Sequence, residues 1–353
     1  MSQCKEDKPT SIFGLSMAQL HPLVEKAVGE AVVCFDISFE HQIEGDYGFA
    51  AEKLIPTFSY VTAAGRRDRV TVFVKYSHNP KSPEPEHYRF LAQHGVPLPK
   101  LYGVMRSPEG RPMLFIEYVD TKDVTRPPVS PEVQLEFLAL VARFNAIQPS
   151  PEYAVWLEQA YRQEREGGGR LRDTVEQAWE LGGHGKLGVP MQQYCTEELE
   201  KRTRLCALAD QVEAQVTGME LGLVSEDFSF ENSGRRANGE RVMLDVEGIG
   251  LGARFMDVAL LVGVPEDQWC PAPYPSREAL AEHYLCEYAR WGGVAPPLDR
   301  FLAETRLLRL NYQIGSTGFG VYLSQPDSPF SAELREEARN GLPQHLEMLA
   351  RYA

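Results

Sequence analysis

Cysteine is scarce in this sequence, and the spacing of the few cysteines excludes the common cysteine-based frameworks. The 353 residues include six cysteines, which are scattered along the chain without a C-x-x-C pair. Neither a zinc site nor a disulfide framework is therefore indicated. Scattered thiols fit a reducing compartment, and we predict a cytoplasmic location.

Basic residues are also in deficit. Lysine and arginine number 36 against 50 aspartates and glutamates, which gives a formal net charge of −14. Sequence-independent binding of nucleic acid depends on basic side chains that neutralise phosphates, so this charge balance argues against it. The acidity is compatible with a cationic substrate, and it is equally compatible with a role in solubility alone.

Long hydrophobic runs are absent as well. A membrane-spanning helix needs about 20 consecutive apolar residues, and no segment approaches that length. The first ten residues are polar and charged, and they lack the apolar stretch of a signal peptide. We expect an intracellular protein that does not insert into a membrane.

The patterning of the apolar residues predicts an α+β fold. Strand-type patterns dominate the first third of the chain after one helical segment, whereas the pattern from residue 131 onward is helical. The predicted strands cover residues 32–35, 54–61, 70–75, 113–120 and 242–244, and the predicted helices cover 16–28, 84–94, 133–146, 196–216, 277–291, 297–316 and 331–352. An antiparallel sheet followed by a mainly α-helical part predicts two layers with a cleft between them.

Polar residues interrupt the apolar pattern between residues 223 and 260. Asp227 and Asn232 stand five residues apart in a predicted loop, and Asp245 ends the short predicted strand 242–244. A hairpin-like arrangement would bring these three residues to one end of the sheet. Two carboxylates and an amide oxygen suit Mg²⁺, which prefers oxygen ligands shared with phosphate. Taken singly, each of them is also typical of a turn or a helix cap.

This spacing resembles the catalytic loop and metal-binding segment of the aminoglycoside phosphotransferase and choline kinase family, which has a protein-kinase-like fold. The family's loop commonly reads H-G-D-x-x-x-x-N, and I-D-W-E-x-A-x-x-G-x-P-x-x-D-L-A follows it. The corresponding residues in this chain are Ser225-Glu226-Asp227, Asn232, Leu244-Asp245-Val246-Glu247, Gly252 and Asp257-Val258-Ala259. The resemblance covers roughly residues 43–262 and implies a small antiparallel-sheet lobe (residues 1–117) and a larger helical lobe (118–353).

The resemblance implies a role for each polar residue of the motif. Asp227 would be the catalytic residue that accepts or orients the proton of the substrate hydroxyl, and Asn232 and Asp245 would hold Mg²⁺. Ser225 departs from the family pattern, because a histidine usually braces the loop there through hydrogen bonds. A serine is shorter and cannot carry a charge, which predicts a less rigid loop and a slower reaction.

The resemblance also implies a set of nucleotide-binding residues. Lys75 would contact the α- and β-phosphates and pair with Glu84, and Glu86 is the second choice of partner. Without the resemblance, the residues alone predict that Lys75 is a surface side chain. The segment ending in Glu117 and Val119 resembles the hinge whose backbone binds adenine. Residues 44–49 suggest a glycine-containing turn over the phosphates, although an ordinary turn has the same composition.

The function implied is transfer of the γ-phosphoryl group of ATP or GTP, with Mg²⁺, to a hydroxyl group of a small molecule. A nucleotide-binding pseudokinase with a regulatory or scaffolding role is the alternative, favoured by Ser225 and the sparse glycine turn. A protein kinase is disfavoured because D-F-G and A-P-E sequences are absent. Glu226, Glu231, Glu247 and Asp257 are candidates for the acceptor site without an assigned role, and Asp257 fits a structural brace better.

Overall fold

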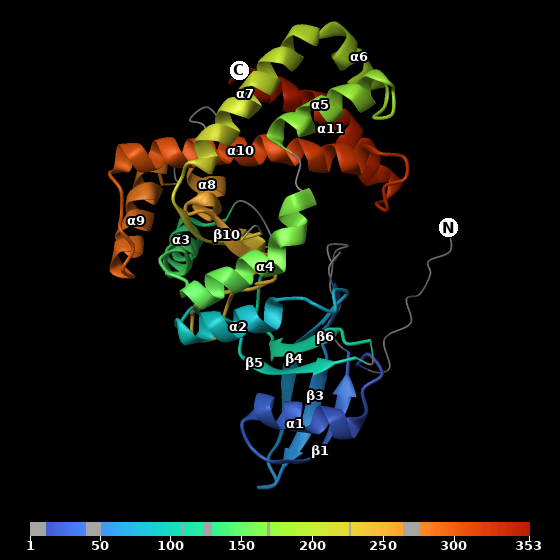
Figure 1. The fold of residues 1–353 in the computed structure, drawn as a ribbon. Helices are drawn as coiled ribbons and strands as arrows, with labels where there is room; N and C mark the ends of the chain where they lie inside the picture. The colour runs from blue at the N-terminus through green and yellow to red at the C-terminus, as the bar shows by residue number, and fades with distance from the viewer. Residues whose placement is uncertain are drawn as a thin grey trace. The chain divides into compact units, whose positions relative to one another are not determined.

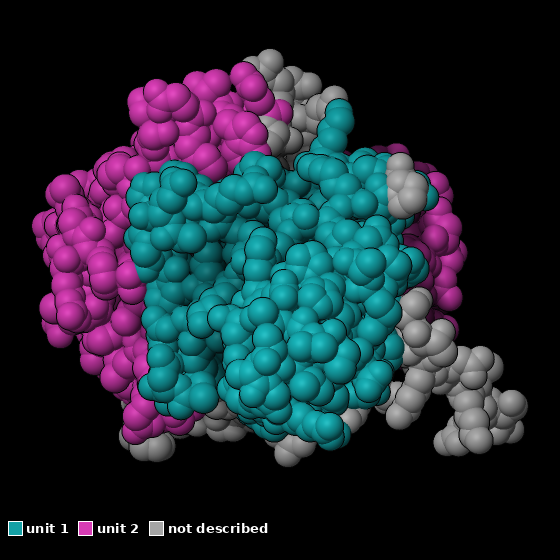
Figure 2. Space-filling model, turned by 90° about the horizontal axis from the view of Figure 1, so that it is seen from below, with its two compact units in different colours: residues 1–129, 229–248 teal, residues 130–228, 249–353 magenta. Residues whose placement is uncertain are grey.

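A computed structural model describes residues 12–39, 51–107, 109–122, 129–167, 170–225, 227–263 and 275–353. The turn predicted at residues 44–49 lies outside these ranges. The chain forms two compact units, coloured separately in Figure 2: Met1–Val129 with Ser229–Gly248, and Ser130–Phe228 with Ile249–Ala353. The lobe boundary between residues 117 and 118 stays a prediction.

The first unit contains an antiparallel six-stranded sheet (Figure 1). Its strands are β1 (Val32–Ser38), β2 (Ala51–Leu54), β3 (Thr57–Thr62), β4 (Arg67–Ser77), β5 (Leu101–Arg106) and β6 (Pro112–Glu117). They run in the order β1-β3-β4-β6-β5, and β2 pairs with β4. The central strand β4 carries Lys75 two residues before its end, opposite Leu114 of β6 and Lys53 of β2.

Two helices accompany this sheet. Helix α1 (Met17–Val28) begins after Ser16, whose side chain forms a capping box with Gln19. Its apolar side chains Leu20, Leu23 and Val24 belong to one buried cluster with residues of β1, β3, β4 and β6. Helix α2 (Glu84–Gln93) has Pro85 in its first turn, where the missing N–H costs nothing, and it buries Glu84.

A separate β-hairpin completes the first unit. The short 3₁₀ helix η1 (Phe230–Asn232) leads into β8 (Ser233–Arg235), which pairs antiparallel with β9 (Arg241–Met243). The turn between the strands contains Gly239 at a φ of 88°, a conformation that glycine adopts without strain. Strand β9 corresponds to the strand predicted at residues 242–244.

The second unit is mainly helical and contains one two-stranded sheet of β7 (Leu221–Ser225) and β10 (Ile249–Ala253). Its helices are α3 (Pro131–Asn145), α4 (Pro151–Gly167), α5 (Leu171–Gly183), α6 (Val189–Glu197), α7 (Leu199–Thr217), α8 (Met256–Val262), α9 (Arg277–Arg290), α10 (Leu298–Ser324) and α11 (Ala332–Ala350). The long helix α10 packs against α5, α7, α8, α9 and α11 (Figure 1). None of the helices within the described ranges is long and apolar enough to cross a bilayer.

Candidate active site

The predicted catalytic loop follows β7 in the second unit, and its start is fixed by buried hydrogen bonds. The backbone N–H of Ser225 donates to Asp257 Oδ1 at 2.9 Å, and Asn145 Nδ2 donates to Asp257 Oδ2 at 2.7 Å. Asn145 also donates to the carbonyl of Leu223 at 3.0 Å and accepts a hydrogen bond from the Tyr284 hydroxyl at 2.9 Å. Asp257 is 3% exposed, and it is the brace that the sequence indicated.

Asp227 itself is exposed and lies between two anchored residues. The Phe228 ring is buried and packs edge-on against Phe137 and Phe144, with ring centroids 5.2 and 5.8 Å away. The Phe228 N–H donates to the Ser225 carbonyl at 3.2 Å, which closes a tight turn around Asp227. A carboxylate in this position can reach a ligand while its backbone stays fixed.

The Ser225 side chain does not take over the bracing role of the family's histidine. Its hydroxyl is buried and has no hydrogen-bond partner among the residues that the structure describes. The backbone N–H of Ser225, held by Asp257, secures the loop instead. The loop therefore retains a brace, although a buried hydroxyl without a partner costs stability.

Asn232 and Asp245, the predicted metal ligands, meet at the base of the β8–β9 hairpin in the first unit. The Leu244 N–H donates to the Asn232 carbonyl at 2.9 Å, directly after the Ser233–Met243 pair of the ladder. Asp245 follows with a φ of 41°, a left-handed conformation that aspartate tolerates better than most residues. The structure thus places Asn232 and Asp245 at the same end of this hairpin in the first unit, and it places Asp227 in the second unit.

Lys75 lies at the centre of a buried group of carboxylates in the first unit. Its Nζ is 2.9 Å from Glu84 Oε2, 2.8 Å from Asp245 Oδ1 and 3.1 Å from Glu247 Oε2. The Lys75 side chain is 4% exposed, that of Glu84 1% and that of Asp245 30%. Glu247 also accepts a hydrogen bond from the Ser82 hydroxyl at 3.2 Å. Lys75 is therefore a buried and paired cation and not a surface side chain.

This charge group shifts the pKa values of its members. Burial lowers the pKa of Lys75, but the three carboxylates raise it more, so the ammonium stays charged. Burial raises the pKa of Glu84 to about 7, against the opposing effect of Lys75. Burial also acts to raise the pKa of Asp245, yet Lys75 and its hydrogen bond hold it below the usual value. Asp245 is accordingly ionised at neutral pH.

Replacing Glu84 with glutamine should change how stability depends on pH. The pKa of Glu84 is about 7 in the folded protein and near 4.5 when unperturbed, so the folded state binds the proton more tightly. Its contribution to stability is complete below about pH 4.5 and is lost as the pH rises to about 7. We expect the Gln variant to lack this loss, as measured by urea unfolding between pH 5 and 8.

Glu86→Gln serves as the control for this experiment. Glu86 lies in the same first turn of α2, but its side chain is 41% exposed and pairs with Arg89 instead of Lys75. The pH dependence of the control should match that of the parent. A stability difference between Glu84→Gln and parent that stays constant across this pH range would contradict the raised pKa.

The predicted nucleotide-base segment, residues 117–119 and hereafter the base segment, closes β6. The Glu117 carboxylate is bound by Arg236 and accepts the Lys100 N–H at 3.0 Å, so this side chain is engaged within the protein. Val119 is buried against Gly234 of β8. The role predicted for this segment rests on its backbone groups, and it stays a prediction.

Sequence reasoning assigned no role to three residues that the geometry makes prominent. Glu247 and Ser82 extend the Lys75 group, and Arg236 binds Glu117. Glu247 lies two residues after Asp245, and this D-x-E spacing was the one available signal. Ser82 and Arg236 occur in turn-rich segments whose composition carries no such information.

The donor groups in the first unit fit Mg²⁺ shared with a nucleotide. A carboxylate with a lowered pKa and an amide side chain at one hairpin base supply hard oxygen atoms, and the charged Lys75 lies beside the carboxylate. The described residues contain no group of three or more histidine, cysteine, aspartate or glutamate side chains arranged to hold a metal. Few protein ligands are typical of Mg²⁺ that depends on substrate phosphates for the remainder of its coordination.

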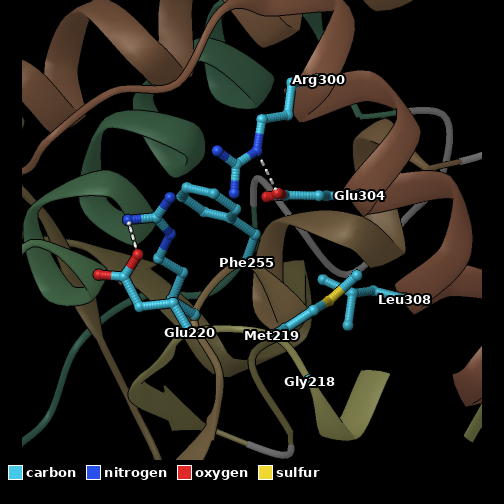
Figure 3. A pocket seen from close by; sticks show the side chains of 8 residues that line it. Gly218, Met219, Glu220, Phe255, Arg300, Glu304 and Leu308 are labelled. Carbon is cyan, nitrogen blue, oxygen red and sulfur yellow. Dashed lines mark hydrogen bonds and ion pairs between the residues drawn. The ribbon is translucent and has the colours of Figure 1, made fainter. Parts of the chain in front are cut away.

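A cavity of about 150 Å³ lies elsewhere, in the second unit (Figure 3), and its lining includes the three residues that directly precede β7. Gly218, Met219, Glu220, Arg254, Phe255, Arg300, Glu304 and Leu308 line it. Its charged groups are paired on its own wall, Arg254 with Glu220 at 2.8 Å and Arg300 with Glu304 at 2.7 Å. None of the predicted site residues lines this cavity.

Residues 59–297 of the chain match the model of the phosphotransferase enzyme family. Among solved structures, amicoumacin kinase hAmiN in complex with AMP-PNP, Ca²⁺ and Ami is similar at a TM-score of 0.53 and 15% identity, covering 96% of this chain and 94% of that one. Spectinomycin phosphotransferase has a TM-score of 0.53 and 10% identity, covering 96% and 98%. No curated protein sequence matches.

An ethanolamine kinase from Plasmodium vivax is also similar, at a TM-score of 0.50 and 10% identity, with 90% of this chain and 82% of that chain covered. Likenesses at such low identity show the fold alone. The chain has the protein-kinase-like fold of these structures, with an antiparallel sheet in its N-terminal region and a helical C-terminal region. The predicted fold class is confirmed.

Proposed function

Because this chain belongs to the phosphotransferase enzyme family, we propose that it transfers the γ-phosphoryl group of ATP or GTP to a hydroxyl group of a small molecule. The observation that carries the proposal is the buried Lys75, held by three carboxylates from two separate segments, α2 and the stretch after β9, at distances of 2.8 to 3.1 Å. A buried cation so tightly positioned has the charge and fixed geometry that binding a triphosphate requires.

The residues of the first unit would bind and orient the nucleotide. Lys75, positioned by Glu84, would contact the α- and β-phosphates, and Asn232 and Asp245 would hold Mg²⁺. The metal, when bound, neutralises charge on the phosphates as the phosphoryl group leaves. Asp245 would be shared between Lys75 and the metal, and Glu84 and Glu247 would keep the lysine in place.

Asp227 would act on the acceptor. Its exposed carboxylate can accept a hydrogen bond from a substrate hydroxyl, orient it and take its proton. The new P–O bond to the acceptor forms as the γ-phosphorus bond to the bridging oxygen breaks, and the nucleoside diphosphate leaves. The buried Asp257–Asn145 network and the Phe228 ring fix the backbone around Asp227. Precise placement of the hydroxyl matters because phosphoryl transfer depends mostly on alignment and charge.

The proposed acceptor is a small molecule with a hydroxyl group, and several chemical classes of such molecules are candidates. The similar structures are named for ethanolamine, amicoumacin and spectinomycin, which differ widely in size. A net charge of −14 supports a cationic acceptor. For the location of the protein we propose the cytoplasm, which is reducing and rich in nucleoside triphosphates. The free thiols of Cys34, Cys195, Cys206 and Cys286 support this location.

Transfer of labelled γ-phosphate from Mg²⁺-ATP and Mg²⁺-GTP tests the proposal. The acceptor panel contains aminoglycosides, amino alcohols, sugars, nucleosides and macrolides, each with the Asp227→Asn protein as control. Transfer to one class that is lost in the control would establish the kinase and its acceptor class. Failure to bind either nucleotide would contradict the proposal.

A nucleotide-binding pseudokinase is the second candidate, and it is favoured by the Ser225 hydroxyl, which has no hydrogen-bond partner within the described part of the chain. In that case the Lys75 group would bind nucleotide while the loop around Asp227 would not support transfer. Nucleotide binding without transfer to any acceptor of the panel, together with equal nucleotide affinity in the parent and in Asp227→Asn, would support this alternative.

A further inference from the structure

Arg236 connects the turn of the β8–β9 hairpin to the base segment. Its Nη2 donates to Glu117 Oε2 at 2.9 Å, and its Nε lies 3.1 and 3.2 Å from the two oxygens of the same carboxylate. Arg236 also donates to the Leu98 carbonyl and to Glu240. The side chains of Arg236 and Glu117 are only 18% and 21% exposed. A two-pronged, partly buried contact of this kind fixes both orientation and distance.

The rest of the hairpin approaches the same segment closely. The Arg235 N–H donates to the Asp120 carbonyl at 2.9 Å, immediately beyond the base segment. A Cβ atom at Gly234 would lie 2.7 Å from Val119 Cγ1, so a residue with a side chain does not fit there without displacement. The backbone of β8 therefore packs directly on the base segment.

The carboxylate of Glu117 is engaged within the protein by these contacts. It accepts hydrogen bonds from Arg236 and from the Lys100 N–H, and its own backbone N–H donates to the Lys100 carbonyl at 2.9 Å. Glu117 thus serves as an anchor through its side chain. What it can offer a ligand is the peptide backbone that follows it.

We propose that Arg236 is a positioning residue for the nucleotide base. Through Glu117 it fixes the backbone of the base segment, against which a purine would form its hydrogen bonds. The other end of the same hairpin carries Asn232 and Asp245, joined by the bond from the Leu244 N–H to the Asn232 carbonyl. With three residues per strand, about 10 Å separate the two ends. The inference rests on the proposed function.

The test compares Arg236→Gln with the matched control Glu240→Gln. Glu240 also binds Arg236, but it is 42% exposed and lies at the hairpin turn, and its loss leaves the contact with Glu117 intact. Affinity is measured by calorimetry for Mg²⁺-ADP, which has a base, and for Mg²⁺-tripolyphosphate, which has none. We expect about tenfold weaker binding of Mg²⁺-ADP by Arg236→Gln, with the base-free probe changed less than about twofold.

Kinetics gives a second readout. The KM for ATP should rise about tenfold in Arg236→Gln while kcat stays within about twofold, because the lost interaction holds the bound nucleotide and does not act on the transferring group. Arg236→Lys should recover part of the affinity through a single hydrogen bond. If Arg236→Gln does not fold, Glu117→Gln weakens the same contact from the other side and should show the same pattern.

The outcomes separate this inference from the proposed function. Equal losses for Mg²⁺-ADP and the base-free probe would show that Arg236 merely supports the fold, and unchanged affinity for both would also overturn its positioning role. Absence of nucleotide binding in the parent protein would instead contradict the proposed function itself.

Discussion

The Asp227→Asn protein is expected to lose phosphoryl transfer by about 10²- to 10⁴-fold while its affinity for Mg²⁺-ADP stays within about twofold of the parent. An amide can still hydrogen-bond to the acceptor hydroxyl but cannot take its proton. The substitution preserves size, and Asp227 is exposed, so no packing is lost. The flanking anchors, the Ser225 N–H bound by Asp257 and the buried Phe228 ring, remain unchanged.

Two measurements on the same preparations test this expectation. Initial rates with the acceptor found in the panel give the loss of transfer, and calorimetry gives the affinity for Mg²⁺-ADP. Asp299→Asn provides the control, because it makes the same chemical change at an exposed residue in the first turn of α10. Unchanged turnover in Asp227→Asn would mean that the acceptor proton leaves by another route.

The family resemblance predicted one contact in the first unit that the local composition does not indicate. The ion pair expected between Lys75 and Glu84 is present, and Glu86 faces Arg89 instead. Both residues lie on elements with clear local signals, an apolar strand end and a helix with proline in its first turn. The family resemblance supplied the pairing, since no local pattern indicates that a strand lysine will be buried.

The remaining members of the site depend on contacts between distant segments. Ser82 binds Glu247 from 165 positions away, and Arg236 binds Glu117 from 119 positions away. Such pairs are set by how the hairpin and the sheet pack together, and a single sequence contains no local trace of that packing. Polar residues are common in turns because they suit turn geometry and contact with water. The turn-like composition around Ser82 and Arg236 therefore favoured surface positions for them.

For the helices of the second unit, prediction from the sequence was limited in a different way. The sequence predicted α3, α7, α9, α10 and α11, but no helix was predicted over α4, α5, most of α6, or α8. Helix α5 buries Val175, Ala178, Trp179 and Gly182, which follow a helical spacing. One of these positions is a glycine, so the apolar pattern in the sequence is incomplete. Helix α4 ends at Gly167. At the end of α5, tertiary packing outweighed the low helix propensity of glycine, since Gly182 is buried against Met191 and Cys195.

Replacing Asp245 should have the second large effect, on the binding of the metal–nucleotide complex. Loss of a carboxylate ligand is expected to weaken Mg²⁺-ADP binding by about 10- to 100-fold, with a corresponding loss of transfer. The Asp245 backbone has a φ of 41°, so Asp245→Ala adds strain of about 1 kcal/mol that Asp245→Asn avoids. Both variants are needed, because agreement between them assigns the effect to the carboxylate.

Comparison of ADP affinity with and without Mg²⁺ isolates the role of the metal. Lys75 keeps Glu84 and Glu247 when Asp245 is replaced, so its position is maintained and metal-free ADP should bind nearly as well as in the parent. The gain in affinity on adding Mg²⁺ should largely disappear. Glu247→Gln removes a different carboxylate from Lys75 and should retain most of that gain. An equal gain in Asp245→Asn and parent would show that the metal binds through other residues, and the hairpin base would then act only through its contact with Lys75.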